Sequence, residues 1–170
     1  MAEDVSAWFT GRVPAEWFAA APEVTVDRDE IVVVGTLEAP AEVEGGDAAR
    51  AEAAAGRIAR FREDTREQRI QIAREAEHRF GRKVAWGARC GDTETTFTRL
   101  AVPVMTRLRQ PERIVLDTLV DAGVARSRSH ALAWCVRLVG QHSSDWLGEL
   151  RAALSDVERL REQGPDAAAG

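Results

Sequence analysis

The chain has 170 residues, 45% hydrophobic and 30% charged, a balance typical of a folded globular protein rather than of a disordered one. No apolar run approaches the roughly 20 residues that a membrane-spanning helix needs, and the acidic start MAEDVSAW is unlike a secretory signal. We therefore expect a cytoplasmic protein without membrane contact.

The net charge of −5 is distributed unevenly along the chain. Residues 1–56 carry three basic and 12 acidic residues, residues 57–140 carry 17 basic and 10 acidic, and residues 141–170 carry three basic and six acidic. A basic block between acidic ends can bind a polyanion such as nucleic acid. The alternative is a solvated surface of mixed charge. Nearly all positive charge is arginine, a bias that indicates a GC-rich bacterial genome.

The first 22 residues contain a near-repeat of two Trp-Phe pairs, formed by Trp8, Phe9, Trp17 and Phe18. Aromatic rings remove large apolar areas from water, so two such pairs in a short span need burial. We expect these rings to pack in the core of the fold. The alternative is that they dock a protein partner.

The next segment predicts a β-hairpin, because Val24 and Val26 alternate with polar residues and Ile31–Val34 is β-branched. The polar stretch Asp27–Glu30 between them is typical of a turn. Residues 39–56 are rich in alanine, glycine and acidic residues and offer little to bury. We interpret them as a linker whose second half is helical.

Residues 57–81 predict one long helix that ends at Gly81, a residue type that commonly terminates helices. Its apolar stripe consists of Ile58, Phe61, Ile72, Ala76 and Phe80. Arg62, Arg66 and Arg69 share one face because they are spaced i, i+4 and i+7. Such a face can bind phosphates; the alternative is a solvated face partly paired with Glu63 and Glu67.

Residues 83–102 predict a second hairpin. Apolar residues alternate along Val84–Cys90, the first strand, Gly91–Thr93 forms the turn, and Phe97–Val102 forms the second strand. With the first hairpin and the helix, this makes a small α+β unit. Residues 111–122 and 129–140 then predict two helices joined by Gly123, and residues 144–162 predict an amphipathic helix.

The helical part contains two short motifs in succession. The first helix ends in LDTLVDAG at residues 116–123, and SRS at residues 127–129 opens the second. With the strand-like VMTRL at residues 104–108, these motifs resemble the ribbon-helix-helix family of DNA-binding proteins. The resemblance extends over residues 104–139, about a fifth of the chain.

The resemblance implies that residues 104–108 of two chains pair into an antiparallel ribbon that enters the major groove of DNA. The side chains expected to face inward are Val104, Thr106 and Leu108, and those expected to face the bases are Met105, Arg107 and Arg109. The alternative is that residues 104–108 form a strand of the chain's own sheet, in which case no ribbon forms between two chains.

The resemblance also implies that the start of the second helix holds a DNA phosphate. Its free backbone amides would bind the phosphate while Ser127 caps the helix and Ser129 follows in its first turn. Arg126 and Arg128 would add positive charge. The alternative is a plain serine cap flanked by two solvated arginines.

The expected fold is α+β, with an N-terminal hairpin-helix-hairpin unit followed by a helical, ribbon-helix-helix-like part that carries an extra amphipathic helix. The expected segments are a Trp-rich N-terminus with a hairpin (1–38), an acidic linker (39–56), a basic helix with a hairpin (57–103), the ribbon-helix-helix-like region (104–163) and a disordered tail (164–170).

The function expected is that of a homodimeric DNA-binding regulator, not an enzyme. The three histidines, His78, His130 and His142, have neither metal-binding nor catalytic spacing, and the two cysteines lie far apart, so we expect no cofactor or metal. One alternative is a scaffold protein that dimerises through the helix pair. Another is an RNA-binding protein that uses the basic side chains of the α+β unit and a stacking ring, namely Arg62, Arg66, Arg69, Arg82 and Trp86.

Overall fold

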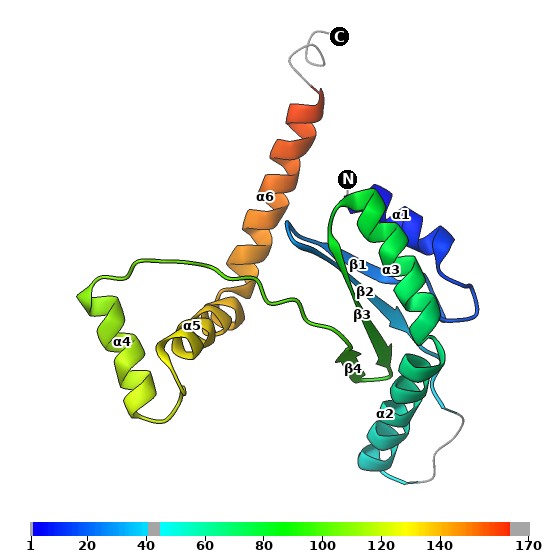
Figure 1. Ribbon diagram of the computed structural model, residues 1–170, viewed down its shortest axis with the longest axis horizontal. Coiled ribbons are helices and arrows are strands. Elements are labelled where there is room, and N and C mark those ends of the chain that lie inside the picture. Colours follow the sequence, from blue (N-terminus) through cyan, green and yellow to red (C-terminus); the bar gives the residue numbers. More distant parts are fainter. Residues whose placement is uncertain (1, 41–44, 164–170) are drawn as a thin grey trace. The chain divides into compact units, whose positions relative to one another are not determined.

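The computed structural model describes residues 2–40 and 45–163, so the expected disordered tail and part of the expected linker lie outside the described residues (Figure 1). The chain divides into two compact units, Met1–Val104 and Met105–Gly170, here termed the N-terminal and C-terminal units. Within the described part of the chain, no helix is long and apolar enough to cross a membrane.

The N-terminal unit is α+β, as expected, and opens with a helix that the sequence did not predict. Its elements are α1 (Ala2–Arg12), β1 (Glu23–Val26), β2 (Glu30–Thr36), α2 (Asp47–Asp64), α3 (Arg66–Phe80), β3 (Lys83–Cys90) and β4 (Thr93–Thr96). The four strands form one sheet in the order β1-β2-β3-β4. The segments 1–38 and 57–103, which we expected to be separate, therefore contribute strands to a single sheet.

The centre of the sheet is the parallel pair of β2 and β3, with Ile31 opposite Val84 and Val33 opposite Trp86. The flanking pairs, β1 with β2 and β3 with β4, are antiparallel hairpins. A parallel pair needs a long crossover connection, which α2 and α3 supply. The two expected hairpins thus become neighbours through pairing between residues more than 50 positions apart.

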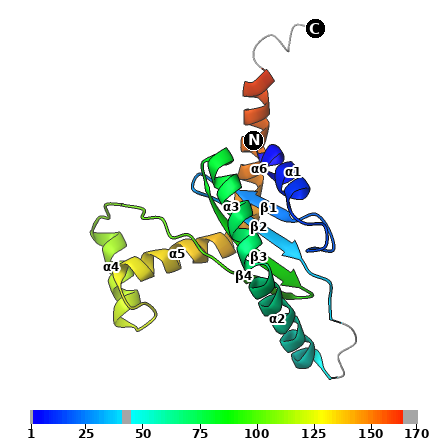
Figure 2. The same cartoon turned by 45° about the vertical axis from the view of Figure 1, so that its right-hand side comes forward.

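The core of the N-terminal unit lies between the sheet and its helices (Figures 1 and 2). The largest fully buried side chains in it are Phe9, Ile31, Ile72, Val5, Val33 and Cys90. The Trp-Phe pairs belong to this core: Phe9 is 0% and Trp17 is 7% exposed. Their rings pack edge-on, with Trp17 5.5 Å from Phe61 between centroids. The expectation of core packing is confirmed for Phe9 and Trp17, and the partly buried Trp8 and Phe18 pack against the same core.

Two expected boundaries in this unit are wrong. The helical second half expected for the linker is confirmed, but it is continuous with the helix expected over residues 57–81, so that α2 begins at Asp47, and the whole is divided in two at Thr65. The Thr65 hydroxyl donates to the Phe61 carbonyl oxygen at 2.6 Å, a bond back to the preceding turn that bends helices. The return strand is β4, not 97–102, because the tight turn at Gly91, with φ of +56°, lets β-branched Thr93 pair at once with Cys90.

The C-terminal unit consists of α4 (Gln110–Asp121), α5 (Arg128–His142) and α6 (Ser144–Gln163). The first two helices pack around a small cluster in which Leu116, Ala125 and Ala131 are buried. Residues 97–109 precede them without helix or strand, so residues 104–108 are not a strand of the chain's own sheet. That alternative for the segment is wrong.

Candidate nucleic-acid interface

The turn between α4 and α5 is built as its sequence predicts. Gly123 adopts φ of +75°, a left-handed conformation that glycine accepts without steric cost. Its N–H donates to the Val120 carbonyl oxygen at 3.0 Å, and the N–H of Ala125 donates to the Leu119 carbonyl oxygen at 3.0 Å. Ala125 is thereby buried between the helices, and the start of α5 is held in a defined position.

The serine cap of α5 is present. Ser127 has extended backbone angles, φ −164° and ψ 163°, and its Oγ accepts a hydrogen bond from the N–H of His130 at 3.2 Å. The amides of Arg128 and Ser129 belong to the same first turn, where a helix offers no backbone acceptor. Serine capping and phosphate binding are therefore compatible here, because the cap uses a different amide.

Arg128 does not extend freely from this helix start. Its Nε donates to Oδ1 of Asp117 at 2.6 Å and its Nη2 to Oδ2 at 2.7 Å, although both side chains are well exposed. The guanidinium lowers the pKa of the Asp117 carboxyl, first through these hydrogen bonds and then through its charge. Arg128 thus joins α5 to α4, while the side chain of Arg126 remains exposed beside the helix start.

Two residues of this surface were not predicted as parts of it. Asp117 is 11 positions from Arg128, a spacing that no local pattern connects. His130 accepts a hydrogen bond at Nδ1 from the N–H of Arg126 at 3.3 Å. A signal for His130 did exist, because the third residue after a serine cap commonly bonds back to the backbone around the cap.

Residues 97–109 form an extended connector before α4. They include three arginines and no acidic residue, and Arg107 and Arg109 are exposed. Met105 is 95% and Val104 is 86% exposed. Leu108 packs against the helix cluster, but Val104 and Thr106 do not face inward as the alternation implied. The reason is that the single chain offers residues 104–108 no second strand to pair with.

The arginines of α2 and α3 do not form the expected phosphate-binding face. Arg69 is 7% exposed; its Nε donates to Thr65 Oγ1 at 3.0 Å and its Nη2 to the Arg62 carbonyl oxygen at 2.6 Å. Burial lowers the pKa of its guanidinium. Arg69 therefore holds the junction of the two helices. Arg62 and Arg66 are exposed, and Arg66 pairs with adjacent Glu67 at 2.8 Å.

The ring expected to stack on RNA is also unavailable. Trp86 is 3% exposed in the middle of β3, with its ring 5.8 Å from that of Phe9 between centroids. Arg82, from the same expected site, donates from Nε to the Asp27 carbonyl oxygen at 2.7 Å. Trp86, Arg69 and Arg82 are therefore engaged in contacts within the fold, whereas Arg62 and Arg66 remain exposed.

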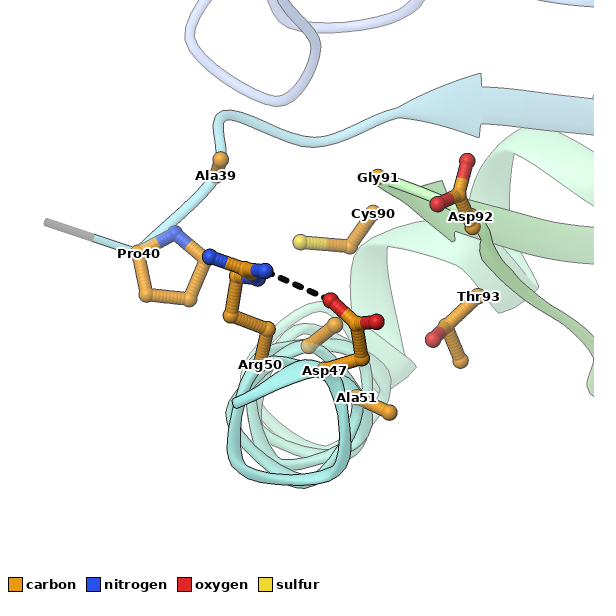
Figure 3. Close-up of a pocket in the computed structure, with 10 residues that line it drawn as sticks. Ala39, Pro40, Asp47, Arg50, Ala51, Cys90, Gly91, Asp92 and Thr93 are labelled. Carbon is orange, nitrogen blue, oxygen red and sulfur yellow. Dashed lines mark hydrogen bonds and ion pairs between the residues drawn. The ribbon is translucent and has the colours of Figure 1, made fainter. Parts of the chain in front are cut away.

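A cavity of about 620 Å³ lies in the N-terminal unit between the first turns of α2 and the turn that joins β3 to β4 (Figure 3). Asp47 and Arg50 form an ion pair on its rim, and Cys90 is fully buried beneath it. The lining is Ala39, Pro40, Asp47, Arg50, Ala51, Ala54, Cys90, Gly91, Asp92 and Thr93. Among the described residues, no three potential metal ligands gather anywhere. The lining side chains are mostly small, and its Arg50 and Asp47 are paired with each other, so nothing in the lining indicates which ligand this cavity would bind.

Two family models match the chain. The model described as "Rv1265-like protein, N-terminal domain" matches residues 3–96, and "Mb1296 C-terminal domain" matches residues 109–161. The uncharacterized proteins Mb1296 of Mycobacterium bovis and Rv1265 of Mycobacterium tuberculosis are each 57% identical to the chain over 165 residues. This alignment covers 97% of the chain and 72% of each relative. No solved structure matches significantly. Both organisms are bacteria, in line with the arginine-rich composition.

Proposed function

The chain belongs to the family defined by the Rv1265-like N-terminal domain, here followed by an Mb1296 C-terminal domain, and we propose that it is a homodimeric DNA-binding regulator. In this proposal the protein is cytoplasmic and not an enzyme, and the C-terminal unit, with the connector before it, contacts the DNA.

The connector is the observation that carries the proposal. It presents Arg107 and Arg109 to solvent next to the almost fully exposed Met105, without an acidic residue between positions 97 and 109. Arginine can bind guanine with two hydrogen bonds in the major groove, and an apolar side chain can contact a thymine methyl group. An exposed basic segment that leads directly into a helix pair therefore suits base contact.

The start of α5 supplies a second, sequence-independent contact. The amides of Arg128 and Ser129 lie at the positive end of the helix dipole, where a phosphate is favoured. Arg126 adds an exposed positive charge one residue before the cap. Arg128 orients this helix end through Asp117, so in this proposal it positions the contact rather than making it.

Dimerisation follows from the extended connector in the same proposal. Residues 104–108 leave their backbone N–H and C=O groups without strand partners, and pairing with the same segment of a second copy would satisfy them. Two copies also double the number of phosphate contacts, which raises both affinity and its dependence on salt.

A gel-shift series tests the proposal directly. Random duplex DNA, single-stranded RNA and a heparin competitor are compared at 50 to 200 mM salt. A dimer that contacts about 6–10 phosphates should lose about 10³–10⁵ in DNA affinity across that range. No binding at low salt would contradict the proposal. Tighter binding of RNA than of duplex DNA would assign the basic surface to RNA instead.

A further inference from the structure

Exposed apolar side chains are confined to one part of the molecule. Fourteen large hydrophobic side chains are exposed among the described residues, and all lie between Leu100 and Leu160. The sheet and helices of residues 2–40 and 45–96 expose none of them. The helices and strands up to residue 96 therefore cover their own apolar surface, whereas the connector and the C-terminal unit expose theirs, as surfaces that bind a partner do.

The longest exposed apolar stripe lies along α6. It consists of Trp146, Leu150, Leu154, Val157 and Leu160, which are 61%, 45%, 56%, 43% and 62% exposed. Three of these residues, Leu150, Leu154 and Val157, together with the half-buried Leu147 before them, follow steps of three, four and three residues. This is the heptad spacing of helices that pair with one another. The other side of the helix carries polar and small residues: Asp145, Glu149, Ala152, Asp156 and Arg159.

The C-terminal unit by itself gives this stripe nothing to pack against. Its buried cluster is formed by Leu116, Ala125 and Ala131, with partly buried apolar neighbours from α4, α5 and the connector, and none comes from α6. A 20-residue helix with five exposed apolar side chains gains little stability from propensity alone. Its stability must therefore come from burial of the stripe.

We propose that the stripe of α6 pairs with α6 of a second copy of this chain in a short coiled coil. A heptad stripe is self-complementary, because each a or d side chain inserts between four side chains of a matching helix. Ile114, Val115, Val136 and Val139 of α4 and α5 are also more than half exposed, so further apolar surface of the C-terminal unit is open to the same partner.

This interface differs from the ribbon pairing proposed above. It joins the copies through residues 146–160, outside the proposed DNA contacts, and it does not depend on nucleic-acid binding. Failure of DNA binding and failure of the α6 interface are therefore separate results, one read from a gel shift and the other from mass measured without DNA.

Light scattering during size-exclusion chromatography tests the proposal on the full chain over a dilution series. The wild-type chain, of 18.6 kDa, should elute as a dimer at micromolar concentration. Leu154→Glu places a charge in the proposed interface of each copy and should raise the dimer dissociation constant by at least about tenfold. Ala152→Glu adds the same charge to the opposite side of the same helix and should leave the dimer unchanged.

Leu154 is not part of the buried cluster of the single chain, so in Leu154→Glu any loss of far-UV circular dichroism should be limited to the contribution of α6. Val157→Glu is a second stripe variant with the same expected result. A wild-type chain that remains monomeric up to about 100 µM would overturn the proposal and indicate a different partner for the stripe. So would dimers of Leu154→Glu and Val157→Glu that dissociate as the wild type does.

Discussion

Arg128, the first residue of α5, donates two hydrogen bonds to the carboxylate of Asp117 in α4, from Nε to Oδ1 at 2.6 Å and from Nη2 to Oδ2 at 2.7 Å. The two planar groups face each other in the geometry that makes arginine–carboxylate pairs specific as well as strong. This pair bridges the turn at residues 122–127, so it fixes the direction in which the first amides of α5 point.

The Asp117–Arg128 pair should make stability depend on pH. The pKa of Asp117 is lowered in the folded chain, so its contribution is present above the unfolded value of about 3.9 and is lost as the pH falls through the folded value. Urea unfolding at pH 7 should show Asp117→Asn less stable than the wild type. That difference should shrink as the pH falls below about 3.9. A difference that persists at low pH would show that the carboxylate charge is not its cause.

The two arginines around Ser127 should differ in DNA binding. Arg126 is exposed and unpaired among the described residues, so Arg126→Ala should reduce the slope of log affinity against log salt by about one unit per subunit. The charge of Arg128 is already balanced by Asp117, so Arg128→Ala should change that slope less. Equal losses of slope in both variants would indicate that DNA displaces Asp117 from Arg128.

Arg107 should contribute specificity rather than general affinity. In the proposed complex it faces bases, so Arg107→Ala should cost about 1–3 kcal/mol on a preferred site selected from random DNA and little on unrelated sequence. Competition gel shifts with the two kinds of duplex measure the ratio. Equal losses on both would make Arg107 a phosphate contact instead.

Arg69 should matter for stability and not for nucleic-acid binding. Its buried guanidinium holds Thr65 and the Arg62 carbonyl, so Arg69→Met should lower the free energy of unfolding by about 1–3 kcal/mol. The control is Arg66→Ala on the same helix, which should change that free energy by less than about 0.5 kcal/mol because Arg66 is exposed. Weaker nucleic-acid binding by folded Arg69→Met would contradict the structural role.

Two glycines should respond in opposite directions to alanine. A Cβ at Gly35 would lie 2.0 Å from Cε1 of Phe18, so Gly35→Ala should destabilise the N-terminal unit by about 1–3 kcal/mol. A Cβ at Gly56 meets nothing within 4 Å on exposed α2, so Gly56→Ala should stabilise the chain by about 0.5–1 kcal/mol. Denaturant unfolding compares both with the wild type, and equal stability of Gly35→Ala would mean that Phe18 moves aside freely.

The candidate interface was predictable where its features are local. The expected helices 111–122 and 129–140 correspond closely to α4 and α5, and the cap at Ser127 and the left-handed Gly123 stand where the sequence predicts them. Caps, turns and apolar periodicity act over a few residues, so a short window of sequence contains the whole cause.

Other parts of the site were not predictable in this way. The spacing of Arg62, Arg66 and Arg69 is the same whether their helix face meets solvent or protein, and only the fold shows that Arg69 is buried beneath the ring of Phe97. The pairing of Arg128 with Asp117 likewise depends on how two helices cross, a relation that sequence spacing does not contain.

By itself, the sequence determined the α+β class, the hairpin turns, the helices of the C-terminal unit and the need of the Trp-Phe pairs for burial. The tertiary structure alone decided that β2 and β3 pair in parallel, that Arg69 is buried, and that the rest of the C-terminal unit leaves an apolar stripe of α6 uncovered. The reason is physical: propensity, capping and periodicity are properties of neighbouring residues, whereas burial depends on which distant surfaces the chain brings together.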